Sequence, residues 1–288
     1  MSEFPDFNPN TRKPNVAPPP KSWDAQIHVF GDPARYPAAS ARIYDPPKGT
    51  FEDAQRMHRA LGIEHAVIAQ ATIYGTDHRL LLDVLEGQKN YVGVAIIDDS
   101  VSDEELMRFH DAGVRGARFN FAKFLGIAPS AATFRRSIDR ITELGWFVKI
   151  HADGEELVEH ADLFQPLTIP VIIDHLGHLD FSKGFDQPGF ALIMELLERD
   201  NWWMMISNGD RFSLQGFPWD DSIPFAQAFL EAAPDRTIWS TDWPHVRYRP
   251  KMPNDADLLE LLYRCVPDAE LRRKVLADNP ARIFKLAD

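Results

Sequence analysis

The chain has 288 residues, 44% hydrophobic and 26% charged, a globular mixture that excludes wholesale disorder. Lys and Arg number 31 against 43 Asp and Glu, and the net charge of −12 disfavours a nucleic-acid partner, which normally requires a basic surface. No apolar run approaches the ~20 residues of a membrane span, and the single cysteine, Cys265, excludes an internal disulfide and a cysteine-based metal site. We therefore expect a cytoplasmic enzyme with a small-molecule substrate, no nucleic-acid or membrane partner, and either a monomeric or a homo-oligomeric state.

The first 22 residues predict an extended arm. Prolines recur at Asn8-Pro9, Lys13-Pro14 and Pro18-Pro19-Pro20, and proline forbids regular helix at and just before its own position. The remaining residues, 23–288, are expected to form one catalytic domain.

From Trp23 onward, short apolar runs alternate with longer amphipathic segments. The apolar runs predict strands at 26–30, 65–71, 91–97, 116–121, 146–151, 170–174, 203–207 and 237–241. Helical spacing of apolar residues predicts helices at 51–61, 79–87, 103–112, 133–144, 189–197, 224–232, 256–263 and 268–277, with a shorter one at 155–161. Eight strand–helix pairs favour a (β/α)8 TIM barrel over a doubly wound open sheet, for which no glycine-rich phosphate loop is present.

Polar side chains gather near the predicted strand ends, where a barrel of this kind carries its active site. Members of this set are Gln26, His28, Thr72, Tyr74, Arg118, Asn120, Lys149, His151, Asp174, His175, Ser207, Asn208, Arg211 and Asp242. Each of them alone has an ordinary structural explanation, such as a surface ion pair or a helix cap. Their convergence on one rim indicates a functional site, because a buried polar cluster is costly unless its members are paired or bind a ligand.

Five motifs resemble the amidohydrolase superfamily, in its amidohydrolase 2 branch. They are Asp24…His28-Val29-Phe30-Gly31, Gly116–Phe121, Ile173–Gly177, Thr241–His245 and Asn279–Arg282. In this order they cover nearly the whole chain. Within the branch, the sequence most resembles the 2-pyrone-4,6-dicarboxylate lactonases and is similar to the D-galactarolactone isomerases. Both resemblances imply a metal-independent barrel enzyme that acts on the lactone of an acid.

The first motif bears on metal binding. The usual pair of histidines on the first strand is here Gln26-Ile27-His28, and a neutral amide is a poor zinc ligand. The isomerase resemblance also implies a glutamine at this position. However, His28, His151, His175 and Asp242 occupy positions that hold a metal in other members, and the related muconolactone hydrolases are metal-dependent. We expect no cofactor, with zinc or another divalent metal at these four residues as the alternative.

The resemblance also implies how the substrate is held. Arg118 and Arg211 match two carboxylate anchors, and paired arginines suit an acidic lactone because each can bind a carboxylate through two hydrogen bonds. The lactonase pattern FNFxKR has a further arginine where this chain has Phe124. Lys149 stands where the lactonases have a tyrosine and could supply that charge. Tyr44, Thr72 and His151 complete the substrate-binding set that we expect.

Hydrolysis is the mechanism that these residues favour. In this hypothesis Asp242 is the general base that removes a proton from water, while His175, His28 and Gln26 polarise the lactone carbonyl. A second hypothesis is lactone isomerisation, in which a substrate hydroxyl attacks in place of water. A third is a metal-dependent hydrolase or decarboxylase, and a fourth is a non-catalytic binding protein on a degenerate barrel.

Overall fold

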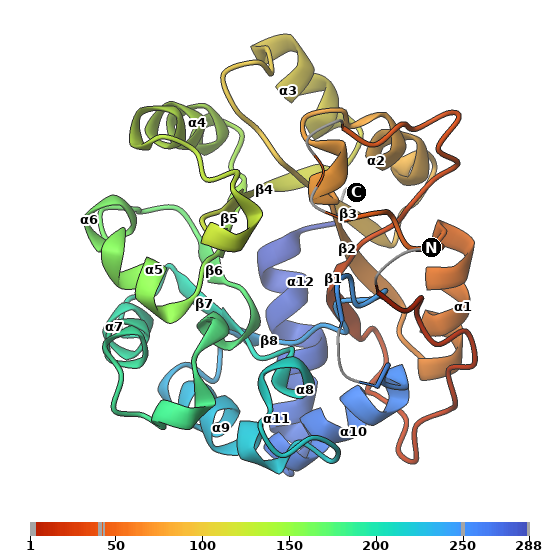
Figure 1. Cartoon of the computed structure of the whole chain (residues 1–288), viewed down its shortest axis with the longest axis vertical. Coiled ribbons are helices and arrows are strands. Elements are labelled where there is room, and N and C mark those ends of the chain that lie inside the picture. The colour runs from red at the N-terminus through yellow and green to blue at the C-terminus, as the bar shows by residue number, and fades with distance from the viewer. Residues whose placement is uncertain (1–3, 40–41, 43, 249–250, 287–288) are drawn as a thin grey trace.

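The computed structural model describes residues 4–39, 42, 44–248 and 251–286, and its strands form one parallel sheet in chain order (Figure 1). The eight strands are β1 (Trp23–Ile27), β2 (His65–Ala69), β3 (Tyr91–Ala95), β4 (Val114–Asn120), β5 (Phe147–His151), β6 (Val171–Ile173), β7 (Trp202–Met205) and β8 (Thr237–Ile238). The segment after β8 returns to β1, where Ala25 N donates to Trp239 O at 3.0 Å and Ile27 bridges to Trp243. The sheet therefore forms a nearly closed barrel, which confirms the expected (β/α)8 fold.

Helices surround the barrel (Figure 1). They are α1 (Phe51–Leu61), α2 (Arg79–Leu85), α3 (Asp103–Asp111), α4 (Ala131–Glu143), α5 (Gly154–Glu159), α6 (Ala161–Phe164), α7 (Pro188–Leu197), α8 (Gly209–Phe212), α9 (Ile223–Ala232), α10 (Asp255–Cys265), α11 (Ala269–Arg273) and α12 (Asn279–Phe284). Side-chain caps mark several starts: Thr50 and Asp53 form a reciprocal capping box at α1, which begins and ends as predicted. The helix predicted over 268–277 is instead divided into α11 and a π-helical turn at Lys274–Asp278, which leads directly into α12.

The amino-terminal end of the barrel is closed by aromatic packing. Phe284 of α12 lies 5.4 Å from the ring of Trp23 and 5.3 Å from that of Phe147, at the starts of β1 and β5. All three side chains are buried. This apolar plug leaves the opposite end of the barrel, where the strands end, as the place where polar side chains gather.

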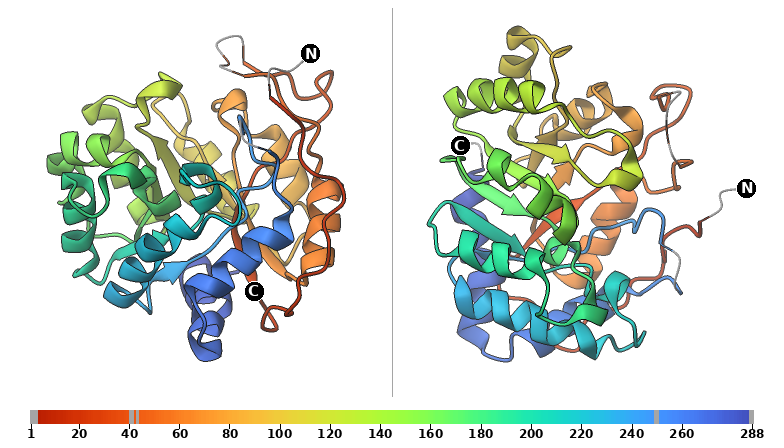
Figure 2. Two further views of the ribbon diagram at one scale, coloured as in Figure 1. Left: turned by 60° about the horizontal axis from the view of Figure 1, so that its bottom comes forward. Right: turned by 60° about the vertical axis from the view of Figure 1, so that its left-hand side comes forward.

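Residues 4–22 form an arm without helix, which runs over the outside of the barrel beside α1 and α10 (Figure 2). Arg12 forms ion pairs with Asp257 and Glu260 of α10, at 2.5 and 2.7 Å. Phe7 packs edge-on against Trp243 at 4.8 Å, close to the carboxyl end of the barrel. Within the described ranges, none of the helices has the length and apolar character needed to cross a membrane.

Candidate active site

A cavity of about 300 Å³ opens at the carboxyl ends of the strands. It is lined by His28, Tyr44, Thr72, Arg118, Phe124, Leu125, His151, His175, His178, Asn208, Arg211, Phe212, Asp242, Val246 and Arg247. Eight of the ten residues expected in the site are therefore brought together there. The other two, Gln26 and Lys149, are fully buried and do not line the cavity.

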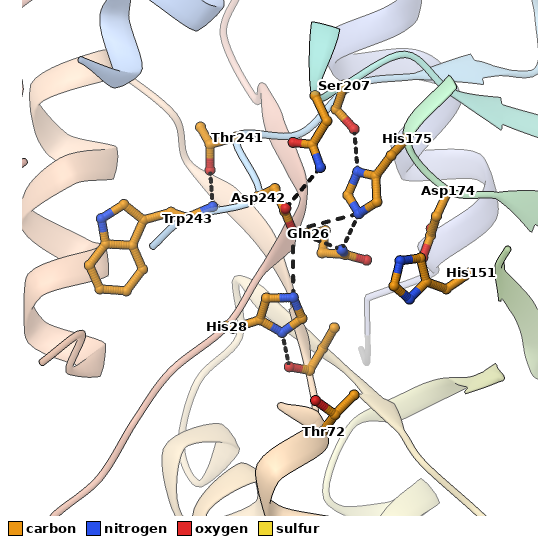
Figure 3. Close-up of polar contacts among 12 residues, drawn as sticks. Gln26, His28, Thr72, His151, Asp174, His175, Ser207, Thr241, Asp242 and Trp243 are labelled. Carbon is orange, nitrogen blue, oxygen red and sulfur yellow. Dashed lines mark hydrogen bonds and ion pairs between the residues drawn. The ribbon is translucent and has the colours of Figure 1, made fainter. Parts of the chain in front are cut away.

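Asp242 lies at the centre of the polar contacts (Figure 3). Its Oδ1 accepts a hydrogen bond from Gln26 Nε2 at 3.0 Å, and its Oδ2 accepts one from Asn208 Nδ2 at 3.0 Å. His28 Nε2 and His175 Nε2 lie 3.5 and 3.6 Å from Oδ1. Each carboxylate oxygen therefore accepts a hydrogen bond from a neutral amide, and the Asp242 side chain also lines the cavity.

The pKa of Asp242 lies well below its usual value. Burial alone would raise this pKa, but the nearby His175, the hydrogen bond with His28 and the charge of Arg211 outweigh burial. The Arg211 guanidinium is 3.8 Å from Oδ2. Asp242 is therefore a carboxylate at neutral pH and can accept a proton.

Asp24 on β1 holds the backbone that carries Asp242. Its carboxylate accepts hydrogen bonds from Thr241 N at 3.0 Å and from the Thr241 hydroxyl, and Thr241 Oγ1 in turn accepts from Trp243 N at 3.1 Å. Asp242 has φ of +59°, a left-handed conformation that aspartate tolerates better than most residues. The first and fourth motifs thus meet to set the direction of the central carboxylate.

The amide of Gln26 has only one orientation that suits its neighbours. Lys149 Nζ donates to Gln26 Oε1, and it also faces Ala25 O at 3.2 Å and Asp174 Oδ1 at 3.3 Å. Three acceptors around Nζ match the three donors of an ammonium group. Because Lys149 can then only donate and the Asp242 carboxylate can only accept, Oε1 must face Lys149 and Nε2 must face Asp242.

This orientation fixes the tautomer of His175. Gln26 Nε2 lies 2.9 Å from His175 Nε2, which must accept, and His175 Nδ1 then carries the proton and donates to Ser207 Oγ at 2.9 Å. Burial lowers the pKa of His175 to about 4, so the ring is neutral at pH 7. The expected donation from His175 to a carbonyl oxygen does not fit this geometry, because Nε2 has no proton to give.

Gln26 and Lys149 also lie elsewhere than the hypothesis expects. Gln26 uses both amide protons on His175 and Asp242, and it lies beneath the cavity instead of facing a substrate carbonyl. Lys149 does not reach a substrate carboxylate, because its ammonium is buried between Gln26 and Asp174. Asp174 also accepts from Arg118 Nε at 2.7 Å. Gln26, Lys149 and Asp174 therefore form a supporting layer beneath the cavity. Arg118, which pairs with Asp174 and lines the cavity, connects the two.

His28 and His151 each direct one ring nitrogen toward a fixed acceptor. His28 Nδ1 lies 2.9 Å from Ala69 O, and His151 Nδ1 lies 2.9 Å from Asn120 Oδ1. In both rings the proton therefore sits on Nδ1. Burial, followed by the charge of Arg118, keeps the pKa of His151 well below its usual value, so its Nε2 is an acceptor.

Several lining residues are not among those that the sequence predicts. His178 follows His175 in the turn after β6, and its ring centroid is 4.6 Å from that of His151. The spacing His175-Leu176-Gly177-His178 is a usable signal, since both histidines belong to one short turn. Asn208 belongs to the polar residues expected at the strand ends, but it is not among the ten residues assigned to the site. Arg247 lies in the loop after β8, where no periodicity predicts the direction of a side chain.

The amidohydrolase family profile matches residues 23–286. The chain belongs to the amidohydrolase family. A 4-sulfomuconolactone hydrolase of Hydrogenophaga intermedia is 37% identical over 92% of this chain and 89% of the relative. A 2-pyrone-4,6-dicarboxylate hydrolase of Comamonas testosteroni is 36% identical over 97% and 95%, and a D-galactarolactone isomerase of Agrobacterium fabrum is 30% identical over 95% and 94%.

Solved structures that share this fold include one with a bound metal. An apo structure from Agrobacterium tumefaciens has a TM-score of 0.87 at 29% identity, covering 97% of this chain and 99% of that chain. A Burkholderia multivorans amidohydrolase with bound zinc has a TM-score of 0.66 at 14% identity over 92% and 99%. Because the barrel can hold a metal in another amidohydrolase, the residues of this chain must be tested for the same property.

The donor set does not suit a metal at His28, His151, His175 and Asp242. A metal ligand needs a lone pair, yet the lone pair of His175 Nε2 receives a proton of the Gln26 amide, which also engages Asp242 Oδ1. The nitrogen of that amide is itself no ligand, and Lys149 prevents it from turning its oxygen inward. Across the described part of the chain, no group of three or more His, Cys, Asp or Glu side chains is arranged to hold a metal ion.

Proposed function

We propose that this amidohydrolase opens the ring of an acidic lactone by adding water, with Asp242 as the general base and no metal among its reacting groups. The observation that carries the proposal is the ionised, buried Asp242 carboxylate in a cavity that also presents Arg118 and Arg211. The arginines suit the acid group of the substrate. The curated relatives named lactone hydrolases support the same reaction class.

The steps follow from the charges in the cavity. Arg118 and Arg211 hold the carboxylate of the lactone, and this positioning removes the entropic cost of bringing the ring to the base. Asp242 takes a proton from water while the water oxygen bonds to the lactone carbonyl carbon. The developing oxyanion lies among the cationic groups of the cavity. The bond between that carbon and the ring oxygen then breaks, and Asp242 returns the proton to the leaving oxygen.

His28 has a specific part in this proposal. Its Nδ1 donates to Ala69 O, so a hydrogen bond from Nε2 to a neighbouring oxygen requires the doubly protonated ring. In that form, Nε2 can donate to the lactone carbonyl beside Asp242, from which it is 3.5 Å away. His175 and Gln26, in contrast, act through Asp242 as positioning residues. Tyr44, Thr72 and His151 contribute polar contacts to the substrate.

Replacement of Asp242 by asparagine tests the assignment directly. The change keeps the size of the side chain but removes the base, and general-base catalysis typically contributes about 10²–10⁴-fold. We expect kcat to fall by about that factor, with affinity for the opened product within a few-fold of the original. A matched control is Asp77→Asn, which changes an exposed carboxylate paired with Arg79. Turnover that survives Asp242→Asn would refute the role of Asp242.

Isomerisation is the second candidate, and Gln26 is the observation that favours it. The isomerase resemblance implies glutamine at this position, and a relative of that name is 30% identical. Here a hydroxyl of the substrate replaces water as the nucleophile, and the same Asp242 can accept its proton. Product analysis by NMR separates the two, because hydrolysis yields an open hydroxy acid and isomerisation yields a rearranged lactone.

A further inference from the structure

Three arginines line the cavity, but their partners differ. Arg118 donates to Asp174 at 2.7 Å, and Arg211 lies 3.8 Å from Asp242. Arg247 has no ion pair with any residue that the structure describes, and its Nε is buried without a hydrogen-bond partner in that same part of the chain. A buried guanidinium nitrogen without a partner is costly, since each such group loses its hydrogen bond to water.

Arg247 is nevertheless held in place. Its Cζ lies 5.0 Å from the ring centroid of Phe124, which also lines the cavity, and 5.8 Å from the ring of Phe4 in the N-terminal arm. Phe124, which is 53% exposed, is thus one of two aromatic rings that position the guanidinium. A guanidinium stacked on a ring keeps the N–H donors on its edge available for a planar anion.

The net positive charge of the cavity favours a ligand that carries more than one negative charge. Arg118, Arg211 and Arg247 contribute three positive charges, and Asp242 is the single carboxylate among the described lining residues. The buried pair of Lys149 and Asp174 adds one charge of each sign. With His151, His175 and His178 neutral, the site carries two positive charges in excess, and the protonated His28 of the proposed mechanism adds a third, so one carboxylate on a substrate does not neutralise the site.

We propose that Arg247, stacked on Phe124, forms an anion-binding subsite separate from Arg118 and Arg211 and selects for a second anionic group on the lactone. One group lies against Arg118 and Arg211, and the other lies against Arg247. The inference rests on the proposed lactone hydrolysis for the identity of the substrate. The anion subsite itself can be tested without turnover.

The binding test uses two inert aromatic acids that differ by one carboxylate, isophthalate and benzoate. Isothermal titration calorimetry should give the wild-type protein a higher affinity for isophthalate by about 10- to 100-fold, the range of one hydrogen-bonded charge pair. Arg247→Met should abolish this preference while leaving the affinity for benzoate within about threefold. Arg79→Met is the matched control, since Arg79 is exposed and pairs with Asp77, and it should behave as the wild type.

A rescue variant addresses the position of the subsite. Because the Phe124 ring lies next to the Arg247 guanidinium, an arginine at 124 should reach the same anion. Phe124→Arg in the Arg247→Met background should therefore restore most of the isophthalate preference. A thermal melt of each variant reports whether it is folded, and a kinetic pair of lactones with one and two carboxylates should repeat the loss of preference in kcat/KM.

The outcomes separate the two proposals. Equal affinity of the wild type for both acids would overturn the subsite, as would an Arg247→Met variant that keeps the wild-type preference or weakens both acids equally. If isophthalate binding depends on Arg247 but no lactone is turned over, the subsite stands and the proposed hydrolysis fails. If lactones are hydrolysed with no dependence on Arg247, the hydrolysis stands and the subsite fails.

Discussion

Lys149→Met is the change that most directly probes the supporting layer. The structure gives Lys149 no access to a substrate, so its effect on activity must pass through the groups that it contacts, and of these Gln26 is the one that donates to Asp242. Without the ammonium, Gln26 Oε1 loses its donor and the amide is free to turn. A turned amide would direct its oxygen at Asp242 and lose the 3.0 Å hydrogen bond to Oδ1.

The magnitude follows from that one contact. A hydrogen bond to a charged group contributes ~1.5–3 kcal/mol, which corresponds to about 10- to 150-fold if it is expressed wholly in kcat. We therefore expect Lys149→Met to lower kcat by about 10- to 100-fold and to change KM by less than threefold. A substrate-binding lysine would instead raise KM.

A double-mutant cycle is the decisive assay. Gln26→Leu and Lys149→Met should each lower kcat, and the double variant should be no worse than the poorer single one, because both changes remove the same contact. Lys183→Met, which removes an exposed lysine paired with Glu155, is the control and should leave kcat unchanged. Effects that add in full on the logarithmic scale would refute the claim that Lys149 acts through Gln26.

Three further predictions address stability and the support of Asp242. Asn208→Leu should lower kcat by about 10-fold, measured at saturating lactone, because Asp242 Oδ2 loses its donor at 3.0 Å; an unchanged kcat would contradict this. Phe284→Ala should lower the free energy of unfolding by about 3–5 kcal/mol in urea, since the side chain is buried against Trp23 and Phe147; a smaller loss than about 1 kcal/mol would speak against the plug. Because burial lowers the pKa of His175 to about 4, the unfolded chain binds more protons between about pH 4 and 6.5, so stability should rise with pH across that window. Urea titrations of His175→Gln should show a shallower rise, and an equal slope would be the contrary result.

The fold and the set of polar residues at the strand ends can both be predicted from the sequence, because both depend on local patterns. Apolar runs with intervening amphipathic segments predict the barrel, and the strand ends predict which residues gather. The predicted strands run too far, as at 203–207 against β7, because apolar character continues into the turn that carries the site. The alternation of side chains along a strand does not predict how far along the barrel axis each side chain lies.

Position along the barrel axis explains why Gln26 and Lys149 do not line the cavity. Gln26 and His28 point to the same interior face, as do Lys149 and His151, but a step of two residues along a strand changes depth by ~6–7 Å. The upper member of each pair lines the cavity and the lower member lies beneath it. Arg247 escapes prediction for another reason: it has φ of +60° in a loop, where neither strand nor helix periodicity directs the side chain.

The central claim is that Asp242 drives lactone hydrolysis without a metal. The most direct measurement is pH-stat hydrolysis of a panel of acidic lactones by protein dialysed against a chelator, alongside a zinc-supplemented sample and the Asp242→Asn variant. We expect equal turnover with and without zinc, and almost none for the variant. Turnover that appears only with zinc would contradict the account, because His28, His151, His175 and Asp242 would then form a metal site despite the Gln26 amide between them.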